Sequence, residues 1–408
     1  TALPPTDPAE HDASASRALA NSPWRPRAYD ARVRFDPESA RAEITVRIEI
    51  VNEDVRPRDT LTLAVRWPFA VAGVRSVTGL VLSDERAAVV AVRLPRAVEP
   101  QAATAVTVRY SIELAPSGRG RPWPAGLAIS HEGVSCLVDW LPAIQPWADS
   151  AGRHLPFPRA RFTTRFDLPE AYTAVAAGRL AVDLTVAGRR RMTWVVDSDP
   201  APEPAFVVGR LRRVVARYTP LVTLRVWALE ADSATLVARA DSIAREASDA
   251  WQYYTQAFGR LPIGDADVVL AEVERAHVAG STFFLSPALP ADSVRVAVAR
   301  VWWGETVRFV GSGARWLDAA LPAWAALAFR AATEGDSVGQ RLIRLAEAAG
   351  QPLAGLEAAR RAVGDASFRV AIRTLFLEHR RRPAAVADLL ALLGPDGSVA
   401  AIPRPDDR

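Results

Sequence analysis

Histidine and acidic side chains are the first candidates for chemistry in this chain, because they bind metals and transfer protons. No two of the five histidines have the spacing of metal ligands on one helix: they are His11, His131, His154, His277 and His379. One substitute set remains open, in which His277 binds a metal together with Glu272 or Glu274. The histidines therefore give no recognisable metal motif.

The sequence also contains no motif typical of nucleophilic catalysis or of cofactor binding. Cys136 is the single cysteine, which excludes an internal disulfide, and its apolar, alternating surroundings predict a buried strand. The serines of G-S-G-A-R and A-G-S-T-F have no G-x-S-x-G context. Neither a Gly-rich phosphate loop nor a haem or iron–sulfur motif is present, so we expect no cofactor.

The segment V-A-V-A-R-V-W-W-G-E-T-V, residues 296–307, is the least ordinary piece of predicted helix. Trp302 and Trp303 are adjacent, and two such large side chains predict core or domain-interface packing. Arg300 interrupts the apolar run before them. Since a buried, unpaired guanidinium is costly, we expect Arg300 either to pair with Asp318 or Glu305 or to be exposed.

Composition limits the class of protein. The 408 residues exceed one ordinary core, so two domains are expected, and 50% hydrophobic with 24% charged residues is typical of a folded chain. All 50 basic residues are arginine, yet the net charge is only +4 and the basic residues are spread along the chain. No basic stripe with interleaved aromatic residues exists, so we expect no nucleic-acid partner. No apolar run is long enough for a transmembrane segment.

Period-two patterns dominate residues 28–228. Apolar residues alternate with polar ones at 44–50, 106–114, 162–168 and 223–226, and Pro and Gly clusters separate these runs. Such half-buried strands predict an antiparallel sandwich or saddle-like sheet.

Helical periodicity replaces the strand pattern from about residue 229 to residue 395. The first helix follows Asp232 and carries Trp251, Tyr254 and Phe258 on one face, and D-A-D-V-V-L-A-E-V then predicts a short buried strand. Further helices are expected at 292–309, 319–332, 338–349, 353–363, 366–379 and 383–393, with Asp365 as a cap. The fold class is therefore α+β, with a β-rich domain followed by a mainly α-helical one.

The order of several strings resembles the aminopeptidase N-type family of zinc metallopeptidases. F-V-V-G-R-L is similar to the junction between its β-saddle and thermolysin-like domains, and A-W-Q-Y-Y-T-Q-A-F-G-R-L-P is similar to its helix–F-G-x-x-P segment. W-L-D-A-A-L resembles W-L-N-E-G-F, and the Trp pair resembles the W-W-G that follows the zinc-binding helix. The resemblance covers about residues 28–395 and implies a β-saddle domain followed by a thermolysin-like domain.

With the Trp pair in register, the resemblance also implies where the zinc site of active members would lie. The motif H-E-x-x-H places the two histidines at Val296 and Arg300 and the general base at Ala297, and the third ligand falls at Ala319. Valine and alanine have no lone pairs, and arginine is a cation that repels zinc. We therefore expect a catalytically degenerate relative with no metal site.

Two further sequence features of this family are also missing from the chain. The G-x-M-E-N segment aligns near V-A-G-S-T-F-F, where Gly280 remains but the glutamate that holds a peptide amino terminus is missing. The transition-state tyrosine should follow residue 340, whereas the last tyrosine is Tyr254. If the former cleft still binds a ligand, Arg300, Gly280 and Asp318 are the candidate residues.

We therefore expect a non-catalytic, peptidase-like scaffold or accessory subunit with one or more protein partners. A respiratory or photosynthetic membrane complex, to which the chain would be extrinsic, is one candidate partner. Two alternatives stay open: a binding module that captures a peptide or small ligand in the former cleft, and a metallopeptidase with relocated ligands.

Both ends of the chain have the composition of extended segments. Residues 1–27 are rich in Pro, Ala, Ser and Asp and predict an extended arm, and residues 396–408 predict a tail. Ordering such segments needs contact area, so we expect at least one of them to contact another chain. The beginning T-A-L-P-P-T is typical of a processed product, which favours an exported, periplasmic bacterial protein whose signal peptide has been removed.

Overall fold

The computed structural model divides into two units, with a boundary between Arg212 and Arg213. The described residues are 22–64, 76–77, 89–113, 127–137, 140–144, 160–196, 204–229, 234–271, 273, 276–311, 313–350, 352–380 and 382–394. Among them, no helix combines the length and the apolar character that crossing a membrane requires. Most of the expected arm and all of the expected tail lie outside this part of the chain.

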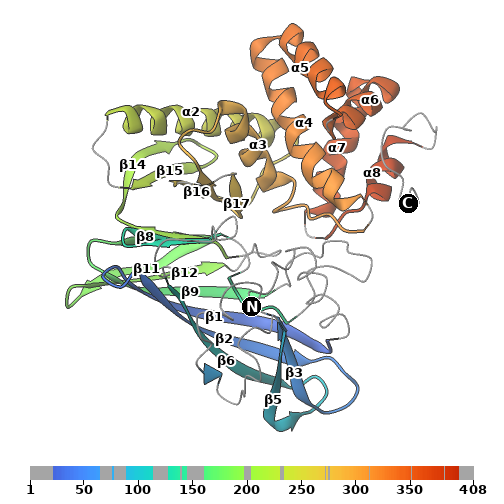
Figure 1. Cartoon of the computed structure of the whole chain (residues 1–408). Helices are drawn as coiled ribbons and strands as arrows, with labels where there is room; N and C mark the ends of the chain where they lie inside the picture. Colours follow the sequence, from blue (N-terminus) through green and yellow to red (C-terminus); the bar gives the residue numbers. More distant parts are fainter. Residues whose placement is uncertain are drawn as a thin grey trace, which may run out of the picture. The chain divides into compact units, whose positions relative to one another are not determined.

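The first unit is built from strands (Figure 1). They are β1 (Trp24–Asp36), β2 (Arg41–Asn52), β3 (Arg58–Ala64), β4 (Ser76–Val77), β5 (Val89–Val98), β6 (Ala103–Glu113), β7 (Leu127–Ser130), β8 (Gly133–Cys136), β9 (Arg161–Pro169), β10 (Thr173–Ala176), β11 (Arg179–Val186), β12 (Arg189–Val196) and β13 (Phe206–Gly209). A seven-stranded sheet has the order β11-β12-β9-β1-β2-β6-β4, a four-stranded sheet the order β10-β13-β8-β7, and β3 pairs with β5.

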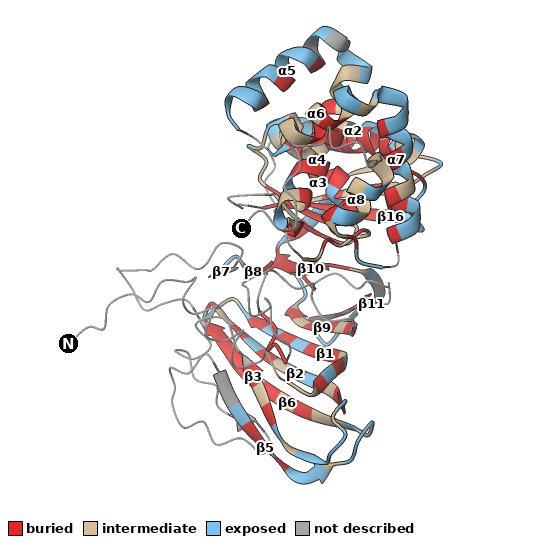
Figure 2. Cartoon of the chain, turned by 90° about the vertical axis from the view of Figure 1, so that its right-hand side faces the viewer, coloured by how far each residue is buried: buried red, intermediate tan, exposed pale blue. Residues whose placement is uncertain are grey.

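Alternation of side chains explains these strands. Ile44, Val46, Ile48 and Ile50 of β2 are all buried, while the residues between them are wholly or partly exposed, and Figure 2 shows the same banding on neighbouring strands. Cys136 is buried in β8, as predicted. Gly133 in β8 has no room for a side chain, because a Cβ there would overlap the carbonyl oxygen of Val208 in β13.

Two expectations for this unit need correction. The arm is predicted to extend to residue 27, but β1 begins at Trp24 and Trp24 is buried. The sheet is predicted to be antiparallel, but β1 and β9 pair in parallel from Ala28 and Arg161 onward. The chain between β1 and β9 is long enough to allow either direction of pairing.

The second unit combines a sheet with helices. Its elements are β14 (Leu211–Tyr218), β15 (Thr223–Leu229), α2 (Ala234–Ala257), β16 (Asp265–Leu270), β17 (His277–Ala279), β18 (Thr282–Leu285), α3 (Ala291–Trp302), α4 (Ala314–Glu334), α5 (Asp336–Ala348), α6 (Leu353–Val363), α7 (Asp365–His379) and α8 (Val386–Leu393). The boundary between the units lies within β14, after its second residue. The strands form one sheet in the order β14-β15-β16-β18-β17.

The domain boundary therefore lies earlier than the predicted 228/229. β15 pairs in parallel with β16 from Thr223 and Asp265, so its alternating pattern belongs to the second sheet and not to the first unit. This pairing could not be predicted from the sequence, because the alternation of side chains indicates a strand but not the neighbouring strand with which it pairs.

Most predicted helices form within a few residues of the expected bounds, and the 353–363 helix matches α6. The helix expected at 292–309 ends early, at Trp302, because Gly304 takes a φ of 129° and the amide of Glu305 donates to the carbonyl of Arg300 at 3.0 Å. The helix expected from 319 begins at Ala314. Asp365 is the first residue of α7, and Gly364 occupies the cap position instead.

Candidate functional site

The two tryptophans after α3 are core residues. Trp302 is fully buried, donates its indole N–H to the carbonyl of Gly259 at 2.9 Å, and lies 5.1 Å from Trp251 between ring centroids. Trp303 is equally buried and packs edge-on against Phe258 at 5.2 Å. The core interpretation of the Trp pair is confirmed.

The four positions aligned with the zinc ligands and the general base lie on α3 and α4. Ala297 is buried, Val296 is half-buried, and Arg300 and Ala319 are exposed. Three of these side chains carry no donor atom and the fourth is a permanent cation, so the residues present do not fit a zinc ion. No chemistry through a metal follows from them.

The second possible metal set is centred on His277. Within the described ranges, no group of three or more His, Cys, Asp or Glu side chains is placed to hold a metal ion. However, Glu272 and Glu274 lie outside these ranges, so the alternative set around His277 stays an expectation.

Charged groups gather instead around the turn at Gly304, and we call Arg300, Glu305, Arg308, Asp318 and His277 the turn cluster. The Glu305 carboxylate accepts the backbone N–H of Gly280 at 2.7 Å, which links it to the β17–β18 turn, where Gly280 has a φ of 62°. A Cβ built on Gly304 would lie 3.9 Å from Asp318 Oδ1. The turn, the start of α4 and the β17–β18 hairpin therefore meet here.

Burial sets the protonation of the turn cluster. It raises the pKa of Asp318 to about 6, against the attraction of Arg300 and with the help of repulsion from Glu305. Burial likewise raises the pKa of Glu305, opposed first by Arg308. The pKa of His277 falls to about 4, because burial and the charge of Arg300 both disfavour its protonation, and its Nε2 has no hydrogen-bond partner in the described structure.

Arg300 is the accessible cation of this cluster. Its side chain is exposed, and it forms no ion pair within 4.0 Å with any residue that the structure describes. Of the two expectations for Arg300, exposure is therefore the one that holds, although Asp318, Glu305 and His277 are all close enough to feel its charge. An exposed guanidinium can bind an anionic group, but it cannot activate water for hydrolysis.

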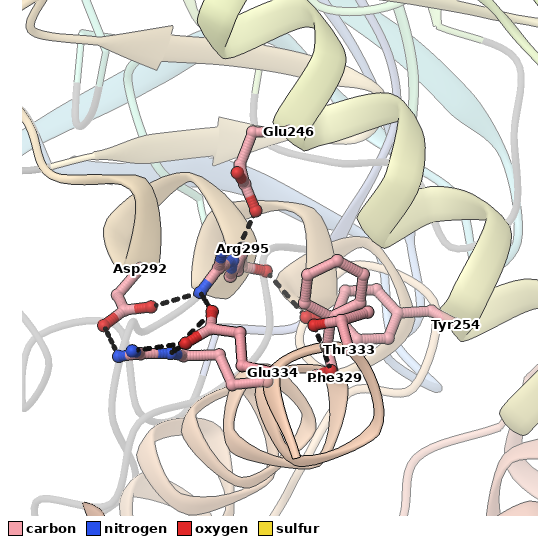
Figure 3. Close-up of polar contacts among 8 residues, drawn as sticks. Glu246, Tyr254, Asp292, Arg295, Phe329, Thr333 and Glu334 are labelled. Carbon is pink, nitrogen blue, oxygen red and sulfur yellow. Dashed lines mark hydrogen bonds and ion pairs between the residues drawn. The ribbon is translucent and has the colours of Figure 1, made fainter. Parts of the chain in front are cut away.

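A second polar cluster, which the sequence does not indicate, surrounds Arg295 (Figure 3). This side chain is only 11% exposed and forms ion pairs with Glu246 of α2, Asp292 of α3 and Glu334 of α4. Arg330 joins the last two carboxylates at 2.8 and 2.7 Å. The i,i+3 and i,i+4 spacings along α3 and α4 were the available signal.

The Arg295 network ties three helices together. The guanidinium carbon of Arg295 also lies 5.1 Å from the centre of the Phe329 ring, beside a groove of ≈ 430 Å³ between α2 and α4. Every charge in the network has a partner, so the arrangement is that of a structural clamp and offers no free group for catalysis.

Comparison with known proteins bears on the fold. No protein-family model matches the chain. No curated protein matches it either. Among solved structures, the chain is similar to an M1 zinc metallopeptidase from Deinococcus radiodurans, with 19% identity, a TM-score of 0.72, and coverage of 94% of this chain and 93% of that chain.

Two further structures give the same result. One is a mutant two-domain M1 zinc metallopeptidase bound to L-tryptophan, at 19% identity and a TM-score of 0.71 with 94% of each chain covered. The other is a mutant Deinococcus radiodurans enzyme bound to a Tyr-Ser-Ala substrate, at 18% identity and a TM-score of 0.69 with 93% of each chain covered. At such identities the likeness establishes the fold alone. The predicted α+β class is thereby confirmed, and the chain has the two-domain fold of the M1 zinc metallopeptidases.

Proposed function

We propose that this chain is a non-catalytic, peptidase-like scaffold or accessory subunit that acts through contacts with other proteins. The proposal rests on the residues at the positions aligned with the zinc ligands and the general base. These residues are Val296, Ala297, Arg300 and Ala319, and none of their side chains can coordinate a metal or accept a proton from water. The proposal includes export from the cytoplasm, and an extrinsic place on a respiratory or photosynthetic membrane complex as the first partner to examine.

Packing around the former site supports this proposal. Trp302 and Trp303 remain in a continuous aromatic core while the side chains next to them lack metal-binding groups. A chain under no constraint would lose such packing, because most substitutions of large buried residues are strongly destabilising. Retention of the fold without this chemistry favours a role for the surface of the protein.

A second candidate function is a binding module that holds a peptide or small ligand at the turn cluster. The exposed Arg300, flanked by the half-buried Asp318, is the observation that favours it. A carboxylate, such as a peptide carboxyl terminus, is the chemical group that Arg300 would bind.

Affinity capture of the tagged full chain from native membranes and from soluble extract, with quantitative mass spectrometry, tests the proposal. The scaffold function predicts one protein partner in near-stoichiometric amount, retained equally by the wild type and by Arg300→Ala. Capture of peptides without a stoichiometric protein, lost in Arg300→Ala, would favour the binding module instead. Tag alone serves as the control.

A further inference from the structure

Strand β11 leaves an apolar stripe in solvent. Val182, Leu184 and Val186 are 38%, 42% and 48% exposed, and β12 places Thr193, Arg191 and Arg189 opposite them, so the three lie on the solvent side of the sheet. β11 is the last strand of the seven-stranded sheet, and no described strand pairs with its outer edge (Figure 1). Within the part of the chain that the structure describes, its outward backbone N–H and C=O groups have no strand partner, so another strand can pair with them.

The usual protection of such an edge is weak here. Natural edge strands carry outward charges or proline that prevent pairing with other chains. Asp183 is the one charged residue between Leu180 and Val186, and Arg190 of β12 holds it by two hydrogen bonds, at 2.8 and 2.6 Å. This pairing lowers the pKa of Asp183 and neutralises its charge within the subunit. A bulge between Leu180 and Val182 limits the flat part of the edge to residues 182–186.

We propose that β11 pairs antiparallel with β11 of a second copy of this chain, across a two-fold axis at Leu184. In this register Leu184 faces Leu184 of the other copy and Val182 faces Val186, so the apolar stripe continues unbroken across the interface. Asp183 then faces Thr185, whereas an axis at Asp183 would bring two aspartates together. This self-complementary pattern is the reason to choose a second copy as the occupant.

Sedimentation equilibrium of the full-length protein tests the pairing. The wild type is expected to dimerise reversibly, and Leu184→Arg, which sets two arginines opposite each other, is expected to raise the dimer dissociation constant at least about tenfold. Val55→Arg is the matched control, because Val55 is 87% exposed and lies outside the strands, and it should leave the dimer unchanged. A monomeric wild type, or a dimer insensitive to Leu184→Arg, would overturn the proposal.

Cross-linking tests the register independently of affinity. Under mild oxidation Leu184→Cys is expected to form a disulfide-linked dimer, since directly opposed residues lie within disulfide range. Thr185→Cys should not, because its own counterpart sits diagonally at about 7–8 Å. Cys136 is buried and will not compete. Equal cross-linking at both positions, or none at 184, would reject this register. The inference does not depend on the proposed function.

Discussion

At the scale of single residues, burial governs the protonation of the turn cluster. It raises the pKa of Asp318 to about 6 and lowers the pKa of His277 to about 4. Neither shift could be predicted from the sequence, because burial depends on the tertiary structure. Residue type alone shows that Val296, Ala297 and Ala319 lack metal-binding groups, but only the resemblance to the zinc peptidases places them at a metal site.

Asp318 makes a testable contribution to stability. Its folded pKa of about 6 lies above its ordinary value of 3.8, so its ionisation opposes folding and stability falls as pH rises between these values. Asp318→Asn removes this penalty. We expect the variant to be more stable than the wild type by about 1–3 kcal/mol at pH 7.5, with the difference shrinking toward zero near pH 4.

Urea unfolding of both proteins at the two pH values measures this difference. His277 acts in the opposite sense, since its lowered pKa removes stability as pH falls from 6.5 to about 4, but it is present in both proteins and cancels. A stability difference that is the same at pH 7.5 and pH 4 would show that Asp318 is not buried as described.

At the scale of elements, the type of each long element was predictable and its partner was not. The helix face of α2 and the alternation of β2 follow directly from hydrophobic periodicity. The strands β17 and β18 have only three and four residues. They were not predicted, because such short segments show no recognisable alternation of apolar and polar residues. The end of α3 is predicted too late, because Gly304, and not the apolar pattern, stops the helix.

The Trp pair joins several of these elements, so its removal should be costly. Trp302 contacts Trp251 and Tyr254, and Trp303 contacts Phe258 and Phe376, all with full or nearly full burial. We expect Trp302→Ala or Trp303→Ala to destabilise the second unit by about 3–5 kcal/mol. Val370→Ala on α7 is the control, because Val370 is 65% exposed. Thermal unfolding unchanged in both tryptophan variants would refute their core role.

At the scale of the whole molecule, the α+β class and the presence of two units followed from the change of period near residue 229, although the boundary lies at 212/213. Partners could not be derived, because recognition depends on which surfaces the fold leaves open. The β11 edge illustrates this point: its alternation is visible in the sequence, but its place at the end of a sheet is a property of the tertiary structure.

Metal content decides whether this chain lacks a zinc site at the positions where the motif of the zinc metallopeptidases would place one. We would dialyse the wild type and the triple variant Val296→His, Arg300→His, Ala319→Glu against zinc and then determine the bound metal by elemental analysis. Ala297 is left unchanged, because it is no ligand and is buried. We expect no stoichiometric zinc and no aminopeptidase activity in the wild type, and about one zinc per chain in the folded triple variant. One tightly held zinc per wild-type chain, or a folded triple variant that binds none, would contradict the absence of the site.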